Sequence, residues 1–222
     1  THVDPENRLL ARGPQFRLSA EQIRDSALAA SGLLSRTVGG PSVRSPQPDG
    51  LWREVGPQRF APSEGDGRYR RSLYTYWKRT VPPPGMMIFD AVSREVCVAR
   101  REATGTSAQA LLLLNDPQYV EAARVLAGRI LDETGQTPDT ADAAIELAVR
   151  HLISRRPSHT EAAELGAALR EQRELFAGSP NEAQALASTG PAPPAKADAV
   201  PHAALTSVVQ IIMNLSEFQE LR

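Results

Sequence analysis

The sequence predicts a mainly α-helical domain with a long proline- and glycine-rich strap in its N-terminal half and little or no sheet. Apolar residues recur at helical spacing through most of residues 106–218. Capping patterns precede several of these segments, whereas residues 37–67 show little periodicity and many turn-forming residues. The β-like run at residues 96–98 is too short to predict a sheet.

The first helix is marked at both of its ends. Ser19 and Gln22 have the spacing of a capping box, and Gly32 suits the C-terminal cap. Ile23 and Ala27 fall on one face between these residues. The irregular stretch that follows is long for a compact domain, so we expect a strap that packs over the surface.

Residues 69–80, YRRSLYTYWKRT, combine aromatic and cationic side chains. Leu73 and Trp77 lie four residues apart, which predicts a short helix with an aromatic inner face. This helix must end before the prolines at 82–84, which predict an extended elbow. We interpret the segment as a structural joint.

Phe89 and Asp90 follow the elbow. We expect Phe89 to enter the core and to leave the Asp90 carboxylate close to the apolar interior. A buried carboxylate is stable only with a partner, and Arg100 or Arg101 is the nearest candidate in sequence. The sequence therefore predicts an ion pair at this point.

The C-terminal half carries consecutive helix signals. Thr106 and Gln109 form a second capping-box pattern ahead of four leucines at 111–114, which predict a helix buried on every side. Asp116 and Pro117 have the order of an N-cap and a first helical residue, so we expect a helix to about residue 132. Further helices are expected at 139–154, at 158–176, from residue 179 and at 202–218, and Ser158 with Glu161 has the capping-box spacing at the start of the second of these.

Residues 187–201, ASTGPAPPAKADAVP, separate the last two of these helices. They contain almost no large apolar side chain, so ordering them would cost entropy without much burial in return. The composition predicts an extended, mobile linker inside a single domain that covers residues 1–222.

Composition and motifs exclude several classes of function. The net charge of −1 argues against a nucleic-acid binder, and no apolar run approaches the ~20 residues of a membrane helix. The four histidines lie far apart and show no metal-ligand spacing, so we expect no metal site. Cys97 is the only cysteine, so no haem-attachment motif exists and we expect no cofactor in this chain. Between two valines, Cys97 is expected to be a small buried residue.

Two groups of side chains are candidates for a functional site. Asp90 with Arg101 could supply a catalytic carboxylate and a cation. A cation–aromatic cluster could bind an anionic ligand or a sugar. The members of that cluster are Arg70, Arg71, Tyr74, Trp77 and Arg79. The structural alternative is favoured for both groups: an ion pair for the first, and for the second a buried aromatic face with outward-reaching cations.

Six runs in the sequence carry a family resemblance. In order, they are DPENRLL, RLSAEQIRDSALAASGLL, GGPSV, YRRSLYTYWKRTVPPPGMMIFDA, QALLLLNDPQYVEAARVLA and NLSEF. Together they resemble the planctomycete-specific domain of unknown function, the PSD type, over almost the whole chain. The sequence TGTSAQAL departs from the family pattern TNTPLQAL at Gly105, Ser107 and Ala108. The Pro/Ala-rich segment before His202 is also longer than in the family pattern.

The resemblance implies a setting for the chain. Such domains lie at the C-terminus of large exported proteins that often carry a cytochrome c-like domain, which implies a periplasmic or extracellular location. The upstream domains of the same parent protein are the implied partners, and any haem would lie there. The first ten residues, THVDPENRLL, contain neither an initiator methionine nor a signal-peptide pattern, which favours a fragment of a longer chain.

The resemblance supplies no established activity and no catalytic residues, so two hypotheses stay open. The first is a non-catalytic structural or ligand-binding module, with a small-molecule or glycan ligand still to be identified. The second is an enzyme that acts on polysaccharide or is linked to cytochrome redox, with Asp90 and the cation–aromatic cluster at its site. A cavity that gathers Asp90, Arg101 and Tyr74 would favour the enzyme, and mutual burial of these groups would favour the module.

Overall fold

The computed structural model describes residues 4, 6–11, 13, 16–48, 50–55 and 59–221, with the backbone alone for residues 54 and 55. Over these residues the chain is mainly α-helical with one two-stranded sheet, which confirms the predicted fold class. The described α-helices are α1 (Ala20–Ser31), α2 (Pro84–Ile88), α3 (Ser107–Asn115), α4 (Pro117–Thr134), α5 (Ala141–Ile153), α6 (His159–Gly178), α7 (Pro180–Ala187), α8 (Ala199–Met213) and α9 (Ser216–Gln219).

The predicted helix starts are confirmed where a capping side chain marked them. The hydroxyls of Ser19, Thr106 and Ser158 accept hydrogen bonds from backbone N–H groups at the starts of α1, α3 and α6. All three form complete capping boxes, which satisfy N–H groups that lack partners within the helix. Asp116 caps α4 through the Gln118 N–H at 2.9 Å, with Pro117 in the first turn.

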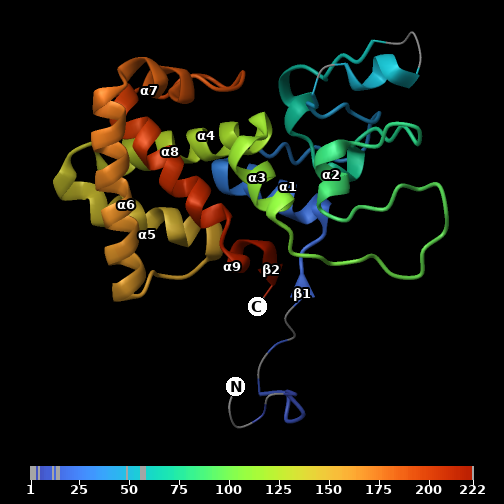
Figure 1. Cartoon of the computed structure of the whole chain (residues 1–222), viewed down its shortest axis with the longest axis horizontal. Coiled ribbons are helices and arrows are strands. Elements are labelled where there is room, and N and C mark those ends of the chain that lie inside the picture. The colour runs from blue at the N-terminus through green and yellow to red at the C-terminus, as the bar shows by residue number, and fades with distance from the viewer. Residues whose placement is uncertain are drawn as a thin grey trace.

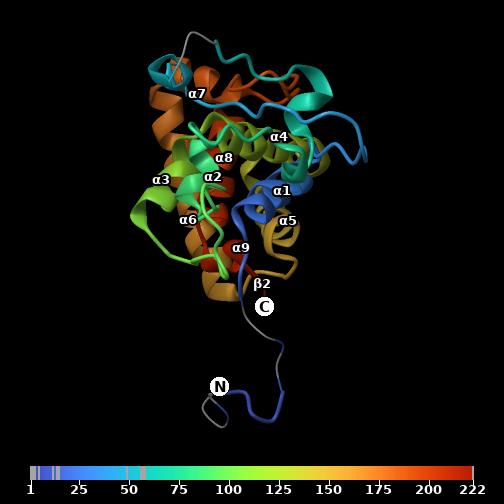
Figure 2. The same ribbon diagram turned by 90° about the vertical axis from the view of Figure 1, so that its right-hand side faces the viewer.

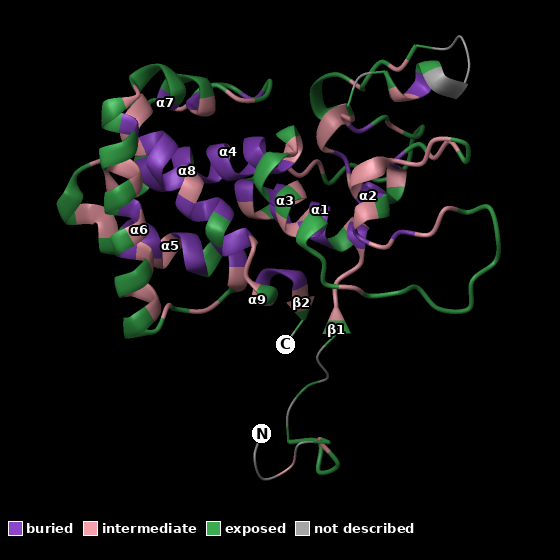
Figure 3. Ribbon diagram, viewed as in Figure 1, coloured by how far each residue is buried: buried purple, intermediate pink, exposed green. Residues whose placement is uncertain are grey.

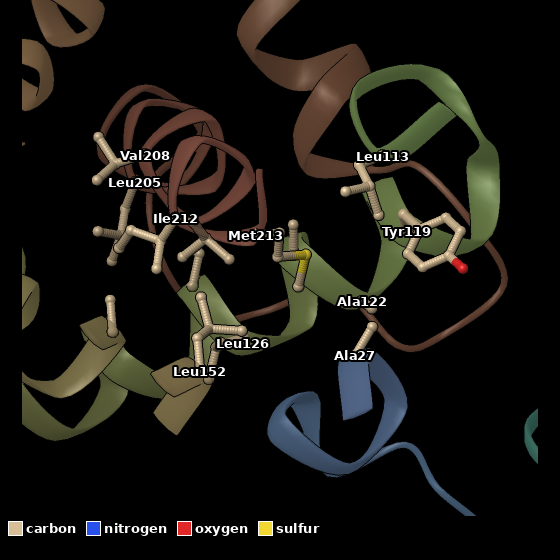
Figure 4. Close-up of a cluster of buried hydrophobic side chains, with 14 of the residues drawn as sticks. Ala27, Leu113, Tyr119, Ala122, Leu126, Leu152, Leu205, Val208, Ile212 and Met213 are labelled. Atoms are coloured by element: carbon tan, nitrogen blue, oxygen red, sulfur yellow. The ribbon is translucent and has the colours of Figure 1, made fainter. Parts of the chain in front are cut away.

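Helices α4 and α8 cross at the centre of the helical body, and α5, α6 and α7 cover their outer side (Figure 1). Helix α8 is apolar on nearly all sides and is correspondingly buried along most of its length, as expected for residues 202–218 (Figure 3). Leu126 from α4 packs with Leu205, Ile212 and Met213 of α8, and all four are fully buried (Figure 4). None of the helices in the described ranges is long and apolar enough to span a membrane.

Residues 33–82 form an irregular lobe on the side of α1 that faces away from α6 (Figure 1). This N-terminal lobe contains the 3₁₀ turns η1 (Leu51–Val55), η2 (Gly65–Tyr69) and η3 (Ser72–Tyr74). The helix predicted over residues 69–80 is therefore wrong. The backbone of this segment pairs instead with a part of the lobe about thirty residues earlier in the sequence. The Val43 N–H donates to Tyr74 O at 2.8 Å, and the Tyr76 N–H donates to Val43 O at 2.7 Å.

Two burial predictions are also wrong. Of the leucines at 111–114, Leu113 is fully buried, whereas Leu111 is 60% exposed and Leu114 is 41% exposed. Helix α3 packs on α2, α4 and α8 and leaves its outer face to solvent (Figure 3). Cys97 is exposed, because the loop between α2 and α3 extends away from the body.

The two ends of the fold are joined by a short antiparallel pair of strands. Strands β1 (Phe16–Arg17) and β2 (Glu220–Leu221) pair with Phe16 opposite Leu221. The Leu18 N–H extends the pairing with a 2.8 Å bond to Gln219 O. The chain therefore enters and leaves the fold at the same edge (Figure 2).

The segment between α7 and α8 lies against α4. The Arg124 guanidinium is 1% exposed and donates to three carbonyls of this segment, those of Thr189 (2.8 Å), Ala192 (2.8 Å) and Pro193 (3.2 Å). The Glu121 carboxylate accepts from the Ala192 N–H at 2.7 Å. The mobility predicted for residues 187–201 stays a prediction, and these contacts show what any opening of the segment would have to break.

Candidate functional site

A cavity of about 470 Å³ lies where the first strand, the start of α1 and the loop before α3 meet. It contains both members of the first candidate group, Asp90 and Arg101, but Tyr74 is not among its lining residues. The lining side chains are Phe16, Arg17, Leu18, Ser19, Ala20, Gln22, Phe89, Asp90, Arg100, Arg101, Glu102 and Ala103. Its charged groups carry both signs, so the cavity has no strong preference for one charge of ligand.

Asp90 follows α2 in a left-handed backbone conformation, with φ of 59°. Its half-buried carboxylate accepts hydrogen bonds from the Thr104 N–H at 2.7 Å and the Thr104 hydroxyl at 2.8 Å. The Gln109 amide donates to Ile88 O at 2.9 Å and lies 3.4 Å from the Asp90 carboxylate. Asp90 therefore ties the end of α2 to the loop that enters α3.

The predicted ion pair between Asp90 and a neighbouring arginine is wrong. Arg101 donates to Glu21 in the first turn of α1, with 2.7 Å between Nη1 and Oε2. Burial raises the pKa of Glu21, but the hydrogen bonds from Arg101, the backbone and Ser19, together with the positive charge of Arg101, outweigh burial and hold that pKa below its usual value. Asp90 is satisfied by neutral donors instead, because Thr104 lies closer to it in the fold than either arginine does.

Replacement of Arg101 by alanine is expected to lower the free energy of unfolding by less than about 1 kcal/mol, because its side chain is 41% exposed and solvent weakens the ion pair. Urea denaturation of the variant and the wild type measures this difference. Glu21→Gln is the matched control, since it breaks the same ion pair from the other side. A loss of 2 kcal/mol or more would show that Arg101 serves a buried partner.

The cation–aromatic cluster is only partly assembled. Arg70 is buried and stacks on Tyr74, with its guanidinium carbon 3.8 Å from the ring centroid. Arg71 lies over the same ring at 5.9 Å. Trp77 belongs elsewhere, since its indole donates to Ser93 O at 3.0 Å, and Arg79 is exposed.

Arg70 and Tyr74 hold the turn that opens the lobe. The Arg70 guanidinium donates to the carbonyls of Pro41 (2.9 Å), Thr37 (3.3 Å) and Gly39. The Tyr74 hydroxyl accepts from the Gly39 N–H at 2.8 Å, and this hydrogen bond is the main cause of a lowered Tyr74 pKa. The Nη groups of Arg70, which a ligand would need, are therefore occupied by the turn itself.

Sequence reasoning missed the buried arginines Arg24 and Arg124. Each lies on a helix and binds carbonyls of an irregular segment far away in sequence. No local pattern distinguishes them from surface arginines. The one signal is indirect: a long segment without helix or sheet needs donors for its carbonyls, and arginine has five.

The comparisons place the chain in a family. A family model described as "Protein of unknown function (DUF1553)", named PSD1, matches residues 1–169, about three quarters of the sequence. No curated protein and no solved structure matches the chain. The match covers the first strand, the N-terminal lobe and α1 to α5, and so includes every candidate residue described above. The chain therefore belongs to the PSD1 family, the planctomycete-specific domain of unknown function.

Proposed function

We propose that this domain is a non-catalytic module whose polar candidates serve the fold, and that it binds a ligand or a neighbouring domain without transforming it. The observation that carries this proposal is the state of the Asp90 carboxylate. Its oxygens accept from the backbone and the hydroxyl of Thr104. A carboxylate that acts as a general acid, a general base or a nucleophile needs an oxygen that is available to the substrate.

The enzyme hypothesis has one observation in its favour. Asp90 and Arg101 both line the 470 Å³ cavity, which is large enough for a small-molecule ligand. However, Arg101 is paired with Glu21, and Tyr74 binds Gly39 outside that cavity. An enzyme acting on polysaccharide or linked to cytochrome redox is therefore the second candidate.

The setting of the module is part of the same proposal. The family resemblance supports a parent protein that is exported to the periplasm or beyond. It also supports upstream domains as the partners of this module, with any haem held upstream rather than in this chain. Purification of the full-length parent, followed by identification of its bound groups and location, tests these statements.

Asp90→Ala is expected to lower the free energy of unfolding by about 1–3 kcal/mol, because the donors of Thr104 lose their acceptor and alanine is poorly suited to the left-handed backbone. Asp90→Asn is the matched control, since asparagine tolerates this conformation and keeps one oxygen acceptor. We expect it to cost less. Urea denaturation measures both variants. Unchanged stability in Asp90→Ala would contradict the structural role and favour the enzyme.

A further inference from the structure

Trp52 in η1 is a buried side chain with an unsatisfied polar atom. It is 4% exposed and packs against Phe60, with 5.3 Å between ring centroids, and against Tyr76, at 6.1 Å. Its indole Nε1 is buried and has no hydrogen-bond partner among the described residues. Buried N–H groups in folded proteins nearly always have an acceptor, so this donor indicates a missing partner.

A cavity of about 70 Å³ lies beside this tryptophan. Its lining is Gly50, Trp52, Arg53, Arg59 and Phe60. The volume corresponds to about two water molecules, which fits a small polar head group and not a sugar ring. Arg53 and Arg59 are exposed, so their guanidinium groups are free to turn towards a ligand at the mouth.

The surroundings of the cavity are cationic. The guanidinium of Arg44 lies 5.4 Å from the centroid of the Trp52 ring, and the ammonium of Lys78 lies 4.3 Å from it. Residues 33–82 as a whole contain nine arginine and lysine residues against four aspartate and glutamate residues. The lobe therefore carries a net charge of +5 in a chain whose total is −1, and its field attracts anions.

We propose that Trp52, Arg53 and Arg59 form a binding site for a tetrahedral oxyanion, a sulfate or phosphate group. The indole N–H would donate to one oxygen, and the two guanidinium groups would bind the others and neutralise the charge. Two guanidinium groups beside one neutral donor match a compact anion with about two negative charges, which favours sulfate or phosphate over a singly charged carboxylate. This inference rests on the proposed ligand-binding role and names the class of ligand.

The chain contains two tryptophans, so Trp77→Phe leaves Trp52 as the only reporter of indole fluorescence. In this background, sodium sulfate and sodium phosphate are titrated at constant ionic strength, with sodium chloride as the reference. We expect a saturable change in Trp52 emission with sulfate or phosphate and none with chloride. No saturable change with either oxyanion would overturn the site.

Substitutions identify the donors. Arg59→Gln and Arg53→Gln, both exposed, are each expected to weaken oxyanion binding by tenfold or more without altering the circular dichroism spectrum. Arg129→Gln on α4 removes the same charge from the helical body and is expected to leave binding unchanged. Trp52→Phe keeps the aromatic ring but removes the N–H, and calorimetric titration is expected to show a tenfold loss. If Arg129→Gln weakened oxyanion binding equally, the binding would depend on the net charge of the protein and not on these arginines, which would contradict the site.

A further titration tests whether the anion is a free ion or part of an ester: the affinity for a monosaccharide sulfate ester is compared with the affinity for inorganic sulfate. Tighter binding of the ester identifies an esterified ligand, and equal or weaker binding identifies the free ion. Loss of this inference would not remove the proposed function: if no oxyanion binds while Asp90→Ala still destabilises the fold, the module stays non-catalytic with a different ligand.

Discussion

Replacement of Arg124 by alanine is expected to lower the free energy of unfolding by about 3–5 kcal/mol, the scale seen when one member of a buried charged network is removed. Its guanidinium binds three carbonyls of the segment between α7 and α8, and the neighbouring Glu121 carboxylate holds an N–H of the same segment. Burial lowers the pKa of Arg124 and the nearby Glu121 opposes that effect, so removing the cation also leaves a buried carboxylate less compensated.

The same variant is expected to expose residues 187–201 to proteases. The cleavage rate follows the population of the opened segment, so it should rise about tenfold for each ~1.4 kcal/mol of local stability that is lost. Arg129→Ala is the matched control on the same helix, because that side chain is exposed and makes one 3.2 Å bond to Ala30 O. Equal urea midpoints and cleavage patterns in the Arg124 variant and the wild type would show that the segment is a mobile linker after all.

Replacement of Arg24 by methionine is expected to cost about 2–4 kcal/mol, because it leaves several buried acceptors without donors. Arg24 is 5% exposed on α1 and reaches into the N-terminal lobe. It donates to Arg68 O at 2.8 Å, to Arg70 O at 3.0 Å and to the side chain of Gln118 on α4 at 3.0 Å. Methionine fills much of the same space, so the loss of stability measures the missing hydrogen bonds and not the creation of a cavity.

Arg24→Lys separates charge from geometry. Lysine keeps the positive charge but presents one compact ammonium in place of a planar fork, so it cannot reach all of these acceptors. We expect most of the methionine loss to persist in the lysine variant, measured by urea denaturation of both. Full stability in Arg24→Lys would show that charge alone holds the lobe and would contradict the role of the fork.

The parts of the fold that sequence predicted are those governed by local chemistry. Three helix starts could be predicted because a capping hydroxyl accepts from N–H groups only two or three residues away, as at Ser19, Thr106 and Ser158. Asp116 before Pro117 does the same for α4. Such signals are contained in a few neighbouring residues, so no knowledge of the tertiary structure is needed to interpret them.

The parts that sequence did not predict depend on distant partners. Leu73 and Trp77 have helical spacing, yet the segment pairs its backbone with Val43 and Ser35, and this pairing outweighs a weak local preference. Asp90 has arginines nearby in sequence, but a threonine fourteen residues away satisfies it. The oxyanion site could not be predicted from sequence either, because only the folded lobe buries the Trp52 N–H without a hydrogen-bond partner.

The strand pair that joins Phe16 to Leu221 has a mechanical consequence. Its two strands are antiparallel, and the chain attaches at the same end of each. A pulling force applied through both flanking segments would therefore act perpendicular to the strands and break their hydrogen bonds one after another, rather than all at once by shear. The strand pair would bear the force before α4 or α8 did, so the domain would open at this edge first while its helical core stayed folded.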